Sequence, residues 1–191
     1  FSVVCSPFYG SNVNFTSLSN CSFNAAEFTN NAVMRDLNYV DSLGKPLGVN
    51  THMFVDNAKS ITLSNCIFKG FATNALKQRG KGIYTNDATI NCTSNNVITN
   101  FANLTYGIFA NQSSAANQIL NVSGNKFTNC YRSIVTRGTR NDNIRSNTIS
   151  IPNNTNSNVG INTWGSGNFT FDANNFTGAT LPLSTTKSYG M

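Results

Sequence analysis

The sequence contains very little charge. Only 10% of its 191 residues are charged, with 13 Lys and Arg against 7 Asp and Glu, whereas about a quarter is usual. Glu occurs once, at Glu27, which excludes a coiled coil or another long-helix protein. There is no run of eighteen apolar residues, so no membrane-spanning helix is predicted. With one His and no C-x-x-C pair, the sequence predicts no metal site and no cofactor.

Amides, hydroxyls and aromatic rings are abundant instead. The chain has 33 Asn, 41 Ser or Thr, 14 Phe and 6 Tyr, and 39% of its residues are hydrophobic. These apolar residues are sufficient for a core, and the length suits one domain, residues 1–191. The composition indicates an all-β protein with many turns. The five Cys cannot all pair, and we interpret them as small buried apolar residues.

An Asn or Cys recurs along the chain, two residues before a Phe or Ile. The intervals between successive Asn or Cys positions are 45, 30, 29, 22 and 27 residues. A Leu, Val, Ile or Phe precedes most of them by three residues. These recurring positions, which we call the ladder, are Cys21, Cys66, Asn96, Asn125, Asn147 and Asn174.

A second motif, of the Gly-Ile-Tyr/Phe type, keeps the same period. Its apolar residues follow one another at intervals of 30, 25, 26 and 27 residues. They are Met53, Ile83, Ile108, Ile134 and Ile161. Two motifs with one period indicate a repeat architecture with insertions in its loops, and they argue against a β-sandwich, which has no common period.

A coil of three short strands accounts for this pattern. Each turn of such a coil rises by one strand spacing, about 4.8 Å, so equivalent residues stack on one another. Stacked Asn side chains can hydrogen-bond along the axis, and Asn also tolerates the left-handed conformation that a bend needs. Stacked charges would repel, which explains their scarcity.

Both motifs resemble the right-handed parallel β-helix repeats of pectate-lyase-like proteins, over residues 12–179. The resemblance implies a right-handed single-stranded parallel β-helix, a solenoid of about six coils and about 30 Å in length. The segments Gly-Ile-Tyr-Thr-Asn and Ala-Asn-Asn-Phe-Thr-Gly resemble secreted surface proteins of Bacteroidetes-type bacteria, which implies type IX secretion. Because neither end shows a cap, we expect the chain to be a segment of a longer protein.

The interval of 45 residues predicts one long insertion, at about residues 24–51. An apolar face from Ala25 to Leu37 could form a short helix there. Long loops on a rigid coil are common places for binding residues. They also cover exposed strand edges, and the sequence leaves both roles open.

Carboxylates that could carry catalysis are scattered. Polysaccharide lyases and hydrolases of this fold use clustered Asp residues, and the sequence has no Asp-Asp or Asp-x-Asp pair. Asp56 and Asp87 follow equivalent strands and could lie one coil apart, but turn residues are the simpler interpretation. His52, four residues before Asp56, is the best remaining candidate for an acid or base. We therefore predict no catalytic residue.

Basic and aromatic residues form the predicted ligand-binding set. A basic cluster could attract acidic glycans, and exposed rings could stack on sugars. The set is Tyr84, Tyr131, Arg132, Arg137, Arg140 and Trp164. Few aromatic residues accompany the basic ones, which gives little support to a nucleic-acid partner.

These observations favour a non-catalytic secreted or cell-surface module: a stalk, an adhesin or a glycan-contacting passenger. Its partner would be a glycan or another surface or secretion protein. One alternative is a fragment of a polysaccharide lyase or hydrolase that acts on acidic glycans. The other is a receptor-binding fibre like a phage tailspike, which would be a trimer.

Overall fold

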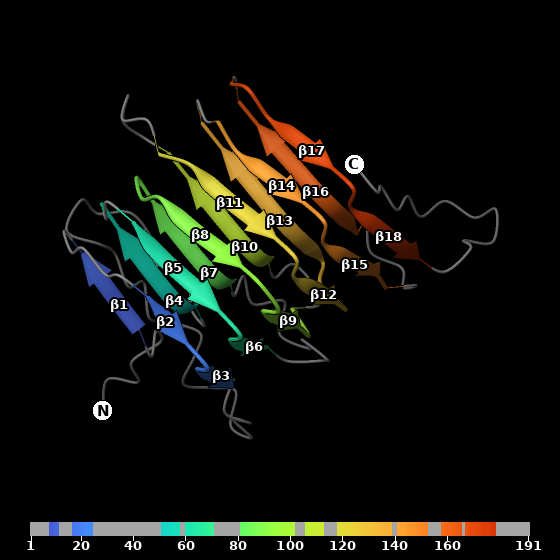
Figure 1. Ribbon diagram of the computed structural model, residues 1–191, viewed down its shortest axis with the longest axis horizontal. Coiled ribbons are helices and arrows are strands. Elements are labelled where there is room, and N and C mark those ends of the chain that lie inside the picture. Colours follow the sequence, from blue (N-terminus) through green and yellow to red (C-terminus); the bar gives the residue numbers. More distant parts are fainter. Residues whose placement is uncertain are drawn as a thin grey trace, which may run out of the picture.

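The computed structural model describes somewhat more than half of the chain. Within the described residues there are eighteen strands, and all of them belong to three sheets (Figure 1). The described residues are 8–11, 17–24, 51–57, 60–70, 81–101, 106–112, 118–138, 141–152, 158–165 and 167–178.

The chain visits the three sheets in a fixed order, A, B, C. Sheet A consists of β1 (Phe8–Ser11), β4 (Thr51–Asp56), β7 (Lys81–Asn86), β10 (Tyr106–Asn111), β13 (Arg132–Arg137) and β16 (Val159–Trp164). Sheet B consists of β2 (Leu18–Ser19), β5 (Ile61–Ser64), β8 (Ile90–Thr93), β11 (Leu120–Ser123), β14 (Asn143–Arg145) and β17 (Thr170–Asp172). Sheet C consists of β3 (Ser22–Asn24), β6 (Ile67–Lys69), β9 (Val97–Thr99), β12 (Lys126–Thr128), β15 (Thr148–Ile151) and β18 (Asn175–Gly178).

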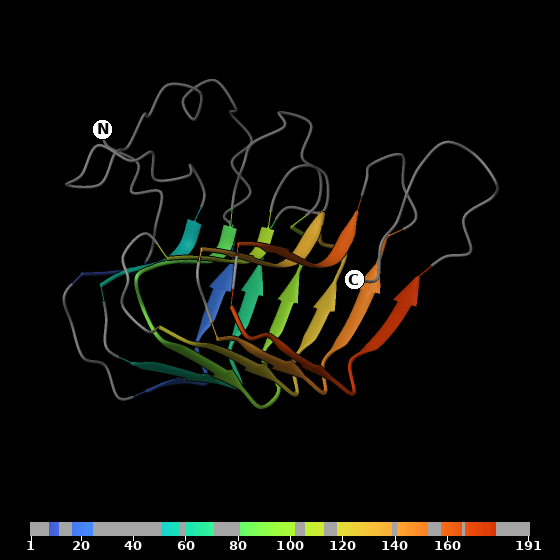
Figure 2. The same cartoon turned by 90° about the horizontal axis from the view of Figure 1, so that it is seen from above.

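Every strand pair within these sheets is parallel and joins successive coils. Met53 pairs with Ile83, and Ile83 with Ile108, so the predicted apolar positions stack in register. Figure 2 shows the three sheets as the walls of one coil that advances along its axis. The prediction of an all-β parallel β-solenoid is therefore confirmed.

About four turns enclose a fully buried core, fewer than the six coils that we expected. In the sheet C column, Phe68 and Phe127 are fully buried, whereas Phe23 and Phe176 at the two ends are partly exposed. The first and last sets of three strands pack against a neighbouring coil on one side only. The core is thus complete in the turns from β4 to β15.

The predicted Asn ladder is present at the bend between sheets B and C. Asn147 shows the pattern: its Nδ2 donates to Val122 O in the preceding coil at 2.9 Å and to Asn174 Oδ1 in the next coil at 2.9 Å. Its backbone N also donates to Asn174 Oδ1, at 3.1 Å. Asn96 and Asn125 repeat these contacts.

Cys66 continues the ladder with a thiol in place of an amide. Its backbone N donates to Asn96 Oδ1 at 2.8 Å, as each ladder Asn does to the next. Its Sγ donates to Leu18 O in the preceding coil at 3.5 Å, the position equivalent to Val122. The sequence alignment of Cys with Asn at this position therefore reflects a shared contact.

The left-handed conformation lies one residue before the ladder, which corrects our explanation of the Asn column. Positive φ angles of 50–67° occur at every residue that precedes a ladder position. These residues are Asn20, Asn65, Asn95, Gly124, Ser146 and Ala173. The ladder Asn residues are thus selected for their hydrogen bonds, and the preceding residue makes the bend.

The predicted insertion is almost entirely untested, because its residues 25–50 lie outside the described residues. Within the residues that the structure describes, no helix is long and apolar enough to cross a membrane.

Replacing a buried ladder amide should destabilise the solenoid strongly. Asn147→Ala leaves Val122 O and the backbone N–H of Asn125 without their partner, and we expect a loss of about 2–4 kcal/mol in the free energy of unfolding by urea. Asn121→Ala provides the control, because this half-buried amide joins the same sheet from outside, through Asn91 and Asn143. Equal losses in the two variants would contradict the importance of the inner ladder.

A glycine at the last bend should stabilise the protein. Ala173 has a φ of 50°, which is unfavourable for a residue with a Cβ. We expect Ala173→Gly to raise the unfolding free energy by about 0.5–1 kcal/mol. Ala110→Gly, at a buried strand position, should lower it in the same assay, and a loss in both variants would refute strain at Ala173.

Candidate ligand-binding surface

The outer face of sheet A carries an unusual number of rings and cations. Side chains alternate between the two faces of a strand, so Phe54, Tyr84 and Phe109 lie on the face opposite the core residues Met53, Ile83 and Ile108. These three rings occupy one register position. The Phe54 and Tyr84 centroids are 4.9 Å apart, and those of Tyr84 and Phe109 are 5.5 Å apart. The rings form a continuous row across β4, β7 and β10, in which Phe54 and Tyr84 are buried and Phe109 is half-buried.

The glycine of the Gly-Ile motifs has a steric cause at the start of these strands. A Cβ on Gly82 would lie 2.9 Å from the ring of Phe101, and a Cβ on Gly107 would lie 3.0 Å from Ile98. Both positions therefore face the core, directly before another core residue. Because two successive residues face the core, the residue before each Gly lies on the outer face. Lys81 is such a residue, and its Nζ lies 4.7 Å from the centroid of the Tyr84 ring.

Arg132 is the centre of the most concentrated group. Its guanidinium carbon lies 5.0 Å from the Trp164 ring, 5.3 Å from the Tyr131 ring and 5.8 Å from the Tyr106 ring. Such distances are those of cation–π contacts. We call these four residues the Arg132 cluster. Trp164 remains 42% exposed, so a large part of its ring is available to a ligand.

A polar row borders the rings at the carboxyl ends of the strands. Asn111 Nδ2 donates to Asn86 Oδ1, and Asn86 Nδ2 donates to Asp56 Oδ1, each at 2.7 Å. Asn86 Nδ2 also lies 3.5 Å from Asp87 Oδ2. Asp56 and Asp87 therefore meet at one amide, as their spacing allowed. Among the described residues, no group of three or more His, Cys, Asp or Glu could hold a metal ion.

The structure brings together three of the six residues predicted to bind a ligand. Tyr131, Arg132 and Trp164 belong to the Arg132 cluster. Tyr84 lies on the same face of β7 but is buried, so the expectation of an exposed ring there is wrong. The exposed Arg137 pairs in register with Trp164. Arg140 lies outside the described residues.

Tyr106 and Lys81 also belong to this surface, although the sequence pattern did not predict them. Both directly precede the Gly of a Gly-Ile motif, and Arg132 occupies the equivalent position. Their shared position before the Gly was visible when the repeats were aligned with one another. Simple alternation along a strand, however, places these residues on the core side. Only the irregular backbone at the glycines turns them outward.

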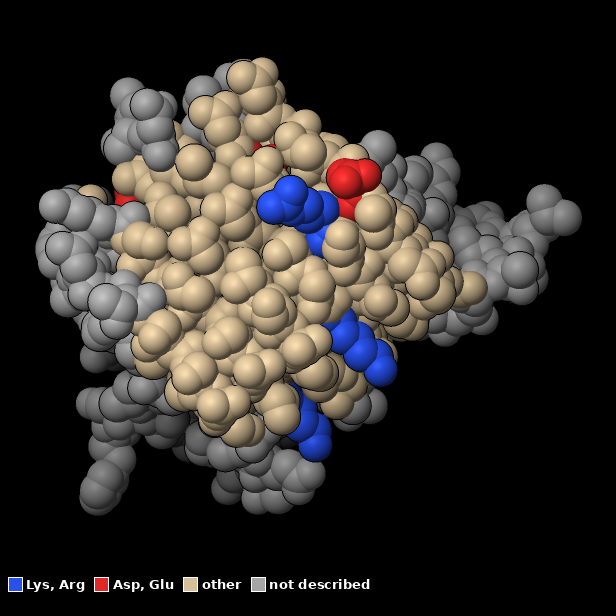
Figure 3. Space-filling model, in the orientation of Figure 1, with Lys and Arg blue, Asp and Glu red and all other residues tan. Residues whose placement is uncertain are grey.

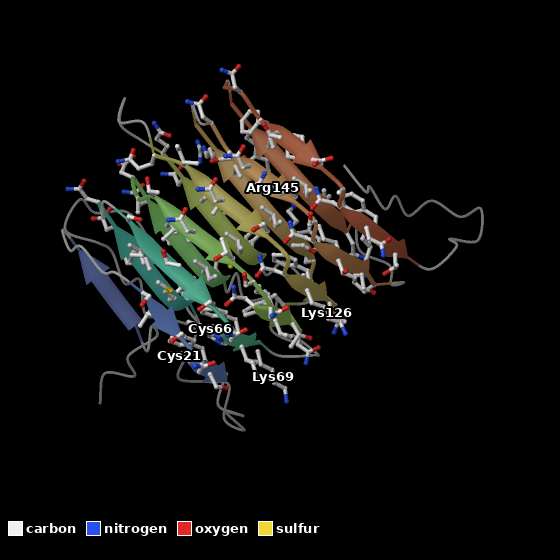
Figure 4. All side chains as sticks on the ribbon, viewed as in Figure 1. Cys21, Cys66, Lys69, Lys126 and Arg145 are labelled. Atoms are coloured by element: carbon white, nitrogen blue, oxygen red, sulfur yellow. The ribbon has the colours of Figure 1, made fainter. Side chains whose placement is uncertain are left out.

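The face of sheets B and C differs from that of sheet A. Most of the surface in Figure 3 is uncharged, and few Lys or Arg interrupt it. Figure 4 shows Lys69, Lys126 and Arg145 extending outward from β6, β12 and β14. On sheet B, an external amide row links Asn91, Asn121 and Asn143. This face provides a natural location for control substitutions.

His52 is not a partner of Asp56. It stands in the Gly column, only 5% exposed, with its ring edge-on to Phe101 at 5.3 Å. Burial lowers the pKa of His52 to about 4, although a hydrogen bond to the Phe23 backbone opposes this shift. Its Nδ1 is buried without a hydrogen-bond partner. His52 is thus a neutral core residue, and the sequence-based pairing with Asp56 is wrong.

Comparison with protein-family models, with curated proteins and with solved structures finds no match to this chain.

The buried His52 should make stability depend on pH. The unfolded chain binds a proton near pH 6.5 and the folded chain only near pH 4, so the unfolded state binds more protons between these values. Stability is therefore complete above pH 6.5 and falls as the pH decreases, by about 1.4 kcal/mol per unit and about 3 kcal/mol in total.

Urea unfolding of wild type and His52→Gln between pH 7.5 and 4.5 measures this contribution. The variant should lack most of the decrease, because carboxylates contribute equally to both proteins. Parallel curves for the two proteins would show that the imidazole titrates normally in the folded state.

Proposed function

We propose that this protein is a non-catalytic secreted or cell-surface module that contacts glycans through the outer face of sheet A. The single observation that carries the proposal is the Arg132 cluster. It combines a cation with three aromatic rings on one rigid face. Rings and cations of this kind are the groups that protein surfaces use to bind sugars with acidic substituents.

The chemistry of the cluster favours an anionic saccharide. The partly exposed Trp164 ring offers a flat apolar surface to the C–H face of a sugar. The Arg132 guanidinium, held among the rings, can donate two parallel hydrogen bonds to a carboxylate or sulfate. Arg137, exposed beside Trp164, adds a second positive charge.

The row from the Arg132 cluster to Lys81 can extend the contact. Tyr106 joins the two cations, since it pairs in register with Lys81 on one side and with Arg132 on the other. Neighbouring strands lie about 4.8 Å apart. A glycan chain that crosses the strands would therefore meet a cation or a ring at each coil from β7 to β16.

The remaining features of the proposal come from the sequence. We propose a right-handed course, since connections between parallel strands of one sheet are almost always right-handed. We also propose an extracellular location in a Bacteroidetes-type bacterium, with type IX secretion, on the basis of the sequence resemblance. A stalk or adhesin, as part of a longer protein, fits a repetitive and rigid body of this kind.

Binding to a glycan array of acidic and neutral polysaccharides tests the function. We expect binding to an acidic glycan, with the dissociation constant raised at least tenfold in Trp164→Ala and in Arg132→Ala, because each removes a direct contact. Arg145→Ala, which removes an exposed Arg from sheet B, should bind as wild type does. Equal weakening in Arg132→Ala and Arg145→Ala, with Trp164→Ala binding as wild type does, would indicate attraction by net charge alone.

The same samples distinguish the alternatives. Release of unsaturated or reducing ends from a bound glycan would indicate a lyase or hydrolase. A trimer in analytical ultracentrifugation would favour a receptor-binding fibre. No binding to any glycan would overturn the proposal.

A further inference from the structure

Cys21 and Cys66 occupy equivalent places in adjacent coils. Strands β2 and β5 pair before them and strands β3 and β6 pair after them, in the same register. Around the two cysteines, Ile67 N donates to Cys21 O at 2.8 Å, and Asn20 N donates to Ser64 O at 3.2 Å. The backbones at the two cysteines are therefore one strand spacing apart.

The two thiols also point toward the same place. Cys66 Sγ donates to Leu18 O at 3.5 Å, and Cys21 Sγ donates to the next carbonyl, Ser19 O, at 3.5 Å. Figure 4 shows the labelled pair side by side at the bend. A strand spacing of about 4.8 Å falls within the Cα separation of about 4.4–6.8 Å that a disulfide spans.

The amide ladder ends at this pair. Asn96 Oδ1 accepts the backbone N–H of Cys66, whereas the backbone N–H of Cys21 meets the Cys66 thiol, whose sulfur is a weaker acceptor than an amide oxygen. The first coil is therefore joined through the Cys66 thiol, which donates to Leu18 O, and lacks the stronger amide link that joins the later coils. A covalent bond at this position would replace it.

We propose that Cys21 and Cys66 form a disulfide that joins the first two coils when the chain meets a small-molecule or protein disulfide. The remaining described cysteines differ from this pair, because Cys92 and Cys130 are both buried in the core, whereas Cys21 is partly exposed. Burial raises the pKa of both of these thiols, which keeps them protonated and unreactive.

The reaction begins at Cys21, which is partly exposed. Its thiolate attacks one sulfur of the disulfide reagent, forms a mixed disulfide and releases one thiolate. The Cys66 thiolate then attacks the sulfur of Cys21 and releases the second. Burial, together with the nearby Cys21 thiol, raises the pKa of Cys66, so Cys66 serves as the second nucleophile. The two cysteines lose two electrons and two protons, and the reagent becomes two thiols.

The experiment uses the purified chain in buffers of reduced and oxidised glutathione. Free thiols are alkylated, and the protein is digested with trypsin and chymotrypsin without reduction. Cleavage after Tyr9 or Phe15 separates Cys5 from Cys21, and cleavage after Lys59 and Lys69 releases Cys66. We expect a linked Cys21–Cys66 peptide, and a decrease from five free thiols to three.

Two variants provide the specificity control. Cys21→Ser should keep its remaining four thiols free, whereas Cys130→Ser should still form the linked peptide. Oxidation closes a loop of 45 residues, which should raise the midpoint of thermal unfolding by roughly 5–15 °C in wild type. The midpoint of Cys21→Ser should not move.

Three results would overturn the proposal. These are a linked peptide that contains Cys5, glutathione bound to Cys21 without closure, and five free thiols in the most oxidising buffer. None of these measurements depends on glycan binding. The failure of the disulfide and the failure of the proposed function are therefore separate outcomes.

Discussion

The whole structure depends on one geometric constraint: each turn of the coil places a residue directly beside its equivalent in the next turn. The side chain at each position must therefore be compatible with the equivalent side chain of the next coil, about 4.8 Å away. Apolar residues satisfy this requirement in the core, as Phe68 and Ile98 do at one register position. Amides satisfy it at the bends and outside, because Asn can donate to one neighbour and accept from the other. Charges do not satisfy it, which explains the unusual composition.

The ladder shows how this constraint acts on single residues. Asn147 uses its side chain to join three coils, while the residue before it, Ser146, adopts the left-handed φ of 54° that makes the bend. The sequence suggested that one Asn both makes the bend and bonds to the next coil, but two neighbouring residues share these roles. At Cys21 and Cys66 the ladder changes its chemistry, and a covalent bond becomes available where the amide link is missing.

On the outer face of sheet A, equivalent positions of successive coils differ most in charge and ring character. This variation makes it the part of the fold suited to binding. Lys81, Tyr106 and Arg132 share one register position but differ in charge and ring character. Tyr106 separates the two cations and contacts Arg132, so like charges do not stack directly. A face of this kind varies from coil to coil, whereas the core and the ladder remain uniform. Variation on a rigid repeat is what allows such a fold to recognise a particular ligand.

The sequence by itself determined the period, the parallel stacking and the ladder, because a repeat imposes its pattern directly on the order of residues. It also identified Tyr131, Arg132 and Trp164 as ring and cation candidates, since they are neighbours of the Gly-Ile strands. Only the tertiary structure decided that these three meet, that Tyr106 and Lys81 join them, and that His52 faces the core. For Lys81 and Tyr106 the reason is the backbone at Gly82 and Gly107, which lies so close to the core residues Phe101 and Ile98 that a Cβ would not fit there. The alternation rule could not foresee this local departure, because it arises from packing between coils.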